Sequence, residues 1–91
     1  MAKVIVTMKL MPTGPEADLD QISKEAEKII SDFGGKIMEN TKQPIGFGIV
    51  AVMVKFNMDE SKGDVEPLEK LLGAVEGVES VEVAAISRAF G

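Results

Sequence analysis

Apolar and polar residues alternate in the first segment of the chain, which is typical of a β-strand with one buried face. The segment runs from Lys3 to Met11, and proline and glycine between residues 12 and 15 end it. The apolar positions that share one face are Val4, Val6, Met8 and Leu10. We therefore expect the chain to open with a half-buried strand.

The next segment changes from strand spacing to helical spacing, from Asp18 to Phe33. Its apolar stripe consists of Leu19, Ile22, Ala26, Ile29, Ile30 and Phe33. Asp18 is placed to cap the helix, with Gln21 in the capping-box position. Gly34 and Gly35 follow, and glycine adopts the left-handed conformation that ends a helix without strain.

Two further strands follow. The segment from Lys36 to Gln43 is polar, which favours a strand at the edge of a sheet. The segment from Gly48 to Asn57 alternates clearly. Its apolar face would contain Val50, Val52, Val54 and Phe56.

A charged turn leads to a second helix, with Asp64 as the expected cap and Gly77 at the expected end. Pro67 is compatible with the first helical turn, where its missing N–H costs nothing. The apolar stripe is Leu68, Leu71, Leu72 and Val75. In the last predicted strand, Val78 to Arg88, one face would carry Val81, Val83 and Ala85 and the other Glu82, Ala84, Ile86 and Arg88.

The element order is therefore βαββαβ, in which each helix has a single apolar stripe. The packing that buries these faces is an α+β ferredoxin-like sandwich, with an antiparallel sheet and both helices on one side. Right-handed crossovers give the strand order 4-1-3-2. The length of 91 residues predicts a single domain over residues 1–91.

The amino-acid composition excludes several classes of function. The chain is 45% hydrophobic and 27% charged, an ordinary globular composition, and it contains neither cysteine nor histidine. Disulfides, cysteine nucleophiles and the commonest general base and metal ligand are therefore excluded. The net charge of −5 argues against binding nucleic acid through its phosphates. No apolar run is long enough for a membrane span, so we expect no membrane partner and a cytoplasmic protein.

Phe47 stands between Gly46 and Gly48, just after Pro44, where a small domain would normally have polar turn residues. The ring either folds back over the rim of the core or serves as an anchor for a partner. Glycines are usually retained for a particular backbone shape or a close approach, and aromatic anchors are favoured in interfaces. Arg88 is likewise either a solvated charge near the C-terminus or a contact residue.

The predicted topology places Phe47 where the third strand begins and Arg88 where the fourth strand ends. These positions lie at opposite ends of the sheet, roughly 25–30 Å apart at the rise of about 3.3 Å per strand residue. The open face of the sheet would be apolar enough for a contact surface. It would carry Ile5, Met11, Ile49, Met53 and Ile86, beside Lys9, Lys55 and Arg88.

Acidic residues also cluster, at Glu16, Asp18 and Asp20 and at Asp59 and Glu60. We interpret them as solvated turns and helix starts, because the glycine-spaced loop of a divalent-ion site is missing. The sequence therefore predicts no metal site and no catalytic residue.

Two segments resemble a known family. "QPIGFGI" from Gln43 to Ile49 and "VESVEVAAISRAF" near the end resemble the elongation factor 1-beta family, and the chain is similar to its short archaeal type. The resemblance covers Lys3 to Arg88. It implies a ferredoxin-like guanine-nucleotide exchange domain that binds the GTPase elongation factor 1-alpha and promotes GDP release, without a cofactor or covalent chemistry of its own.

The resemblance also implies roles for single residues. Phe47 would insert into a pocket on the second domain of the GTPase, and Arg88 stands where the family has a lysine that reaches the magnesium site. Arginine is not equivalent to a compact ammonium group, so Lys9 or Lys55 would be the alternative cations. The candidate partner-binding residues are Pro44, Gly46, Phe47, Gly48, Ile86 and Arg88.

Other proteins share this architecture, and the fold alone does not assign a function. A phosphatase of this kind would need an arginine in a glycine-rich loop after the first strand, and an RNA-binding module would need exposed stacking aromatics on a basic surface. A metallochaperone would need a cysteine pair. The remaining alternative is a regulatory, ligand-binding or oligomerising module that uses the open face of the sheet.

Overall fold

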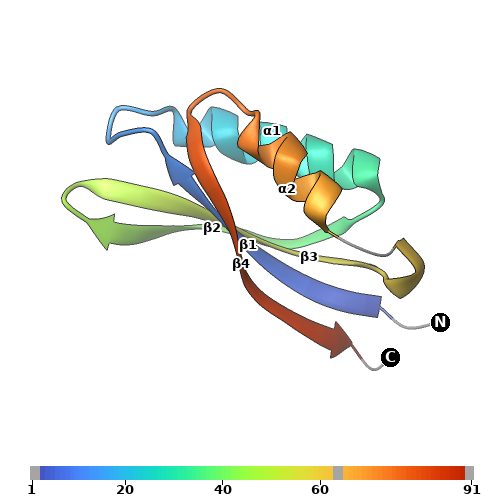
Figure 1. Cartoon of the computed structure of the whole chain (residues 1–91). Coiled ribbons are helices and arrows are strands. Elements are labelled where there is room, and N and C mark those ends of the chain that lie inside the picture. The colour runs from blue at the N-terminus through green and yellow to red at the C-terminus, as the bar shows by residue number, and fades with distance from the viewer. Residues whose placement is uncertain (1–2, 63–64, 90–91) are drawn as a thin grey trace.

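The computed structural model describes residues 3–62 and 65–89. The described residues form four strands and two α-helices in the predicted order, and the expected charged turn contains one turn of 3-10 helix (Figure 1). In chain order the elements are β1 (Lys3–Pro12), α1 (Leu19–Phe33), β2 (Lys36–Gly46), β3 (Ile49–Asp59), η1 (Glu60–Lys62), α2 (Glu66–Gly73) and β4 (Val78–Ala89).

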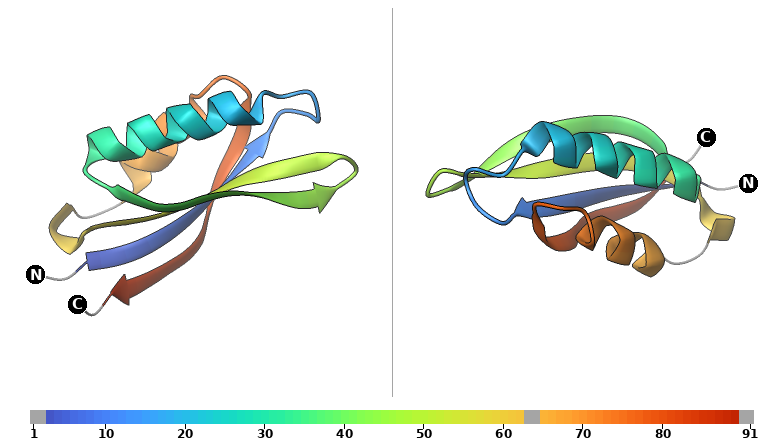
Figure 2. Two further views of the ribbon diagram at one scale, coloured as in Figure 1. Left: turned by 180° about the vertical axis from the view of Figure 1, so that it is seen from behind. Right: turned by 90° about the horizontal axis from the view of Figure 1, so that it is seen from above.

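The sheet has the strand order β2-β3-β1-β4, which is the predicted order read from the other edge. All pairs are antiparallel, and β1 lies between β3 and β4. Both helices lie on the same side of the sheet, as Figures 1 and 2 show. The α+β ferredoxin-like arrangement is therefore confirmed. None of the helices in the described part of the chain is both long and apolar enough to span a membrane.

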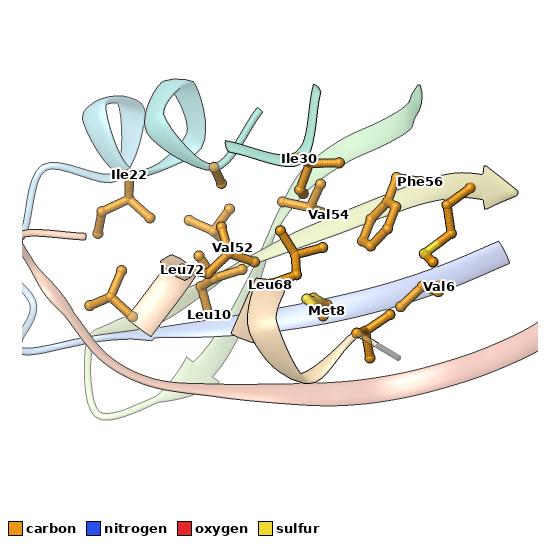
Figure 3. Packing of buried hydrophobic residues seen from close by; sticks show 14 residues of the cluster. Val6, Met8, Leu10, Ile22, Ile30, Val52, Val54, Phe56, Leu68 and Leu72 are labelled. Carbon is orange, nitrogen blue, oxygen red and sulfur yellow. The ribbon is translucent and has the colours of Figure 1, made fainter. Parts of the chain in front are cut away.

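The core fills the layer between the helices and the sheet (Figure 3). It is built from the predicted faces of β1 and β3 and from the stripes of both helices. No charged or polar residue is buried among the described residues. The largest fully enclosed side chains are Val6, Met8, Leu10, Ile22, Ile30, Val52, Val54, Phe56, Met58, Leu68 and Leu72.

Helix α1 begins and ends as the sequence predicts. The backbone N–H of Gln21 donates a hydrogen bond to Asp18 Oδ1 over 3.1 Å, so Asp18 is the N-cap. Gly34 is the C-cap with φ of 108°, a left-handed conformation that glycine adopts without strain. The backbone N–H of Gly35 donates to the carbonyl oxygen of Ile30 over 2.9 Å.

Helix α2 differs from the prediction at both ends. The expected cap Asp64 lies outside the described residues, and Val65 occupies the N-cap position without a side-chain cap hydrogen bond. The helix ends at Gly73, before the expected Gly77, which lies in the turn into β4 with φ of 93°. Leu71 was wrongly assigned to the buried stripe, because its side chain is 52% exposed.

Strand β2 is an edge strand, as predicted, and it runs on to Gly46. Two side chains fix it to α1. Asn40 Nδ2 donates to Glu27 Oε2 over 2.7 Å, and Lys42 Nζ lies 3.0 Å from Asp20 Oδ1. These contacts bring the polar strand against the helix although β2 buries few apolar side chains.

A β-bulge in β4 overturns the predicted faces of its second half. Met8 of β1 pairs with Val83, but Thr7 pairs with Ala85, so Ala84 is an extra residue on β4. After the bulge, Ile86 pairs with Val6 and Arg88 pairs with Val4. Directly paired residues project from the same face of a sheet. Ile86 and Arg88 therefore lie on the helix side, and Ala85 lies on the open face.

The open face consequently lacks the predicted exposed apolar surface. Ile86 has left this face, and the other apolar residues assigned to it are only partly exposed: Ile5, Met11, Ile49 and Met53. A depression on this face is lined mainly by polar residues, among them Thr7, Glu39, Thr41, Gln43 and Lys55. The alternative function, a regulatory, ligand-binding or oligomerising module on the open face, therefore loses the exposed apolar surface that motivated it.

Candidate functional site

Phe47 lies at the tip of the β2–β3 hairpin, and its side chain is fully exposed, at 103% of the reference value. Three consecutive residues have positive φ: Gly46 at 135°, Phe47 at 56° and Gly48 at 77°. Positive φ at both loop residues, Phe47 and Gly48, is the pattern of a type I′ turn, which matches the twist of a hairpin. The interpretation that the ring covers the rim of the core is therefore wrong.

The sequence around Phe47 explains why the loop forms. Pro44 is tolerated because it lies on an edge strand beside a β-bulge at Ile45. Gly46 and Gly48 adopt positive φ without steric cost, whereas the left-handed conformation costs roughly 1–2 kcal/mol for a residue such as Phe47. Turns of this type normally carry Asn or Gly at that position. The hairpin thus keeps a large ring in a strained and solvent-facing place.

We call residues Pro44–Gly48 the hairpin tip. Ile45, 42% exposed, adds a second apolar side chain to it. The loop before α1 approaches its base, since a Cβ atom built on Gly48 would lie 4.0 Å from Pro15 Cβ. Exposed apolar residues concentrated on one tip are characteristic of a contact site.

The opposite end of the molecule carries Ile86 and Arg88 on β4. Ile86 is 58% exposed although it pairs with the buried Val6, because the second half of β4 runs clear of both helices (Figure 1). Arg88 Nη2 donates to Glu60 Oε1 over 2.8 Å, which joins the end of β4 to η1. We call Glu60, Ile86 and Arg88 the arginine end.

The two candidate contact regions are far apart. The pairings of Val4 place Arg88 level with Met58, nine residues after Ile49, where β3 begins beside the hairpin tip. At about 3.3 Å per residue the separation is roughly 30 Å. This agrees with the longest dimension of the molecule, 42 Å, and with the placement of the β2–β3 loop and the end of β4 in Figure 1. Phe47 and Arg88 do not share a pocket.

The alternative cations lie elsewhere. Lys9 pairs with Met53, and Lys55 pairs with Thr7, so both project from the middle of the open face. Neither reaches the hairpin tip or the arginine end. Arg88 is therefore the only one of the three predicted cations that the structure places at the end of the sheet.

The acidic residues act as caps and ion-pair partners. Asp18 caps α1, and Asp59 Oδ1 accepts a hydrogen bond from the backbone N–H of Ser61 over 2.9 Å. That hydrogen bond is the main reason why the pKa of Asp59 is lowered, and the hydrogen bond from Lys42 lowers the pKa of Asp20. Among residues 3–62 and 65–89, no cluster of acidic side chains is arranged to hold a metal ion.

Sequence reasoning missed Glu60, which it treated only as part of a charged turn. The contact with Arg88 depends on the bulge at Ala84, and the sequence offers no separate signal for that bulge.

The topology and the exposed ring together define a class of protein. The topology is that of a ferredoxin-like domain, and a fully exposed ring on a rigid hairpin is typical of a domain that contacts another protein. The chain belongs to the EF-1 guanine nucleotide exchange domain family, whose sequence pattern matches residues 5–89.

Relatives of similar length agree with this assignment. The chain is 38% identical to an elongation factor 1-beta from Methanocella arvoryzae over 90 residues, covering 99% of this chain and 100% of the relative. It is 33% identical to the elongation factor 1-beta of Methanococcus vannielii over 87 residues, covering 96% and 98%. The family and these names assign the chain to the nucleotide exchange factors of translation elongation.

A solved structure shares the fold at low sequence identity. The C-terminal domain of the MgtC protein from Mycobacterium tuberculosis superposes with a TM-score of 0.61 at 15% identity, over 98% of this chain and 88% of that one. At this identity the likeness concerns the fold alone.

Proposed function

We propose that this protein binds the GTPase elongation factor 1-alpha and promotes the release of its bound GDP, so that GTP can load. In this proposal residues 1–91 act as a single exchange domain in the cytoplasm, where elongation takes place. Family membership supports the general role. The named partner and the contact residues are our inference from the two ends of the molecule.

The hairpin tip supplies the anchor. Phe47 is fully exposed on a two-residue turn that is closed by the paired strands β2 and β3, and the flanking glycines accept the positive φ that this turn requires. A pre-ordered aromatic side chain loses little conformational entropy when it enters a pocket, and buried aromatic residues are frequent hot spots of interfaces. We infer that Phe47 inserts into an apolar pocket on one domain of the GTPase.

The arginine end supplies the positive charge. The phosphates of bound GDP and the Mg²⁺ ion that they share with the GTPase form a strongly charged site. A guanidinium group brought to that site repels the metal ion and competes for its anionic ligands, which lowers the affinity for the nucleotide. By linkage, the nucleotide weakens the binding of the exchange factor by the same factor. The exchange factor needs no nucleophile, base or cofactor of its own for this step.

The observation that carries the proposal is the placement of Phe47 and Arg88 at opposite ends of one rigid sheet. A separation of roughly 30 Å along β-strands suits contacts with two domains of a large partner. Anchoring at one end then determines where the cation arrives at the other.

The test is stopped-flow release of a fluorescent GDP analogue from the cognate elongation factor 1-alpha. We expect the release rate to rise with the concentration of this protein and to saturate. Size-exclusion chromatography of this protein mixed with nucleotide-free elongation factor 1-alpha should give a stable complex. Unchanged release together with no complex would contradict the proposal and would favour a regulatory or ligand-binding module instead.

A further inference from the structure

The ion pair between Arg88 and Glu60 connects two segments that are distant in the sequence. Arg88 Nη2 lies 2.8 Å from Glu60 Oε1, and both side chains remain substantially exposed, at 66% and 42%. Glu60 is the first residue of η1 and directly follows β3. The contact thus joins the end of β4 to the turn that leaves β3, with β1 between the two strands.

The geometry of the sheet makes this contact possible. The bulge at Ala84 places Arg88 opposite Val4, and Val4 also pairs with Met58, which is buried on the helix side. The chain continues from Met58 into η1 on that side. If Ala84 were paired regularly with Thr7 instead of being bulged, every later residue would shift by one position. Arg88 would then point to the open face, where Glu60 could not reach it.

This pair contributes little to the stability of the fold, because exposed ion pairs are weakened by solvent and by salt. Its geometry has another effect. A guanidinium group has five N–H donors, and the contact with Oε1 uses Nη2 while the side chain stays two-thirds exposed. The group is therefore held at one edge and remains accessible for a second anion.

We propose that Glu60 is a positioning residue for Arg88, an inference that rests on the proposed function. The Glu60 carboxylate restricts the rotamers of the long Arg88 side chain and turns its remaining N–H donors outward. A planar guanidinium fixed in this way matches a phosphate or a carboxylate group of the partner by paired hydrogen bonds. Arg88 then meets the anionic ligands of the partner's nucleotide site without first losing its conformational freedom.

A different role for Glu60 would give the opposite result. If the carboxylate only neutralised Arg88 and kept it from the partner, removing Glu60 would speed exchange. Positioning predicts slower exchange at saturation, so the sign of the effect separates the two roles.

The experiment measures GDP release from elongation factor 1-alpha with Glu60→Ala and Glu60→Gln. We expect Glu60→Ala to lower the saturating rate by about threefold to tenfold, the cost of immobilising one rotamer-rich side chain. The factor concentration that gives half of the saturating rate should change much less, because the hairpin tip provides the anchor. Gln keeps an acceptor oxygen, so Glu60→Gln should recover part of the rate.

Two controls keep the result specific. Glu79→Ala removes an exposed carboxylate elsewhere on β4 and should leave the rate unchanged. In an Arg88→Ala background, Glu60→Ala should have no further effect, whereas a merely structural role would lower the rate equally in both backgrounds. Urea denaturation of each variant reports the stability.

The inference is overturned if Glu60→Ala leaves the rate unchanged, raises it, or acts equally with and without Arg88. In those cases wild-type protein would still accelerate GDP release, so the proposed function would stand. If wild-type protein itself has no effect on release, the proposed function fails first.

Discussion

Phe47 and Arg88 lie at opposite ends of the same sheet, roughly 30 Å apart at the rise of a β-strand. Phe47 is fully exposed on the β2–β3 hairpin, and Arg88 is held beside η1 by Glu60. No ligand of ordinary size touches both residues at once. The two ends can therefore be tested separately, with one set of variants for anchoring and another for exchange.

Replacing Phe47 with asparagine should change stability and activity in opposite directions. Asparagine accommodates the left-handed backbone at φ of 56°, so the free energy of unfolding should rise, by about 1 kcal/mol. Loss of the ring should slow GDP release at least about tenfold at a fixed, subsaturating concentration of factor, as expected for a hot spot. Urea denaturation and stopped-flow release measure the two effects. A lower stability would show that the ring supports the fold.

Replacing Arg88 with alanine should lower the saturating rate of exchange more than it weakens binding, since in the proposed arrangement Phe47 still provides the anchor. The measurement is the dependence of GDP release on factor concentration, which separates the saturating rate from the half-saturating concentration. Lys9→Ala and Lys55→Ala serve as matched controls, because both remove a cation from the open face. If either control lowers the saturating rate and Arg88→Ala does not, the cation has been assigned to the wrong residue.

Replacement by alanine should change the free energy of unfolding in opposite directions at Gly35 and Gly73. A Cβ atom on Gly35 would lie 2.7 Å from Ile30 Cγ2 and 3.0 Å from Phe56 Cδ2, inside the packed core, so Gly35→Ala should cost about 1–3 kcal/mol. On Gly73, within α2, it would lie 4.0 Å from Val81 Cγ2, an ordinary contact. Gly73 has no positive φ, so Gly73→Ala should gain about 0.4–1 kcal/mol, because alanine has less conformational freedom than glycine in the unfolded chain. Urea denaturation tests both values, and equal effects would contradict this packing.

Acid should weaken the contact between β2 and α1. The hydrogen bond from Lys42 is the main cause that lowers the pKa of Asp20 from its ordinary value of 3.8. A lowered pKa in the folded state stabilises the fold above the unfolded value, and this contribution is lost as the pH falls through the folded value. As the pH is lowered below about 4, the urea midpoint of Lys42→Met should therefore fall less steeply than that of the wild type. Lys28→Met, an exposed lysine on α1, is the control and should leave the steepness unchanged.

The sequence predicted the fold well because its elements have clear periodicity and end signals. Asp18 and Gly34 define α1, and the alternation from Val50 to Phe56 defines β3. The end of helix α2 was predicted less accurately, because Gly77 is as plausible an end as Gly73 when only residue types are known. The C-cap of α2 is Ala74 in the right-handed conformation, so no glycine signal marks this end of the helix.

The candidate site was predictable only in part. The glycines beside Phe47 indicated an unusual loop, but exposure of the ring depends on how the hairpin twists away from the core. The faces of β4 were wrong after Ala84, because strict alternation assumes that no residue is inserted into the strand. A bulge is determined by pairing with β1, and a single sequence does not record it. For the same reason the contact between Glu60 and Arg88 was not foreseen.

Moving the guanidinium group to the other face of β4 tests whether the side of the sheet matters for exchange. Arg88 pairs with Val4 on the helix side, whereas Ser87 pairs with Ile5 on the open face. Ser87→Arg combined with Arg88→Ser therefore moves the cation to the open face, away from Glu60. Because β4 is an edge strand, we expect the domain to remain folded. The saturating rate of GDP release should fall to the level of Arg88→Ala.

Deleting Ala84 is the matched control for this exchange of residues. The deletion removes the bulge but leaves Arg88 opposite Val4, on the helix side and beside Glu60. The saturating rate should therefore stay close to that of the wild type. Full exchange activity with the cation at position 87 would show that the side of the sheet on which it lies does not matter.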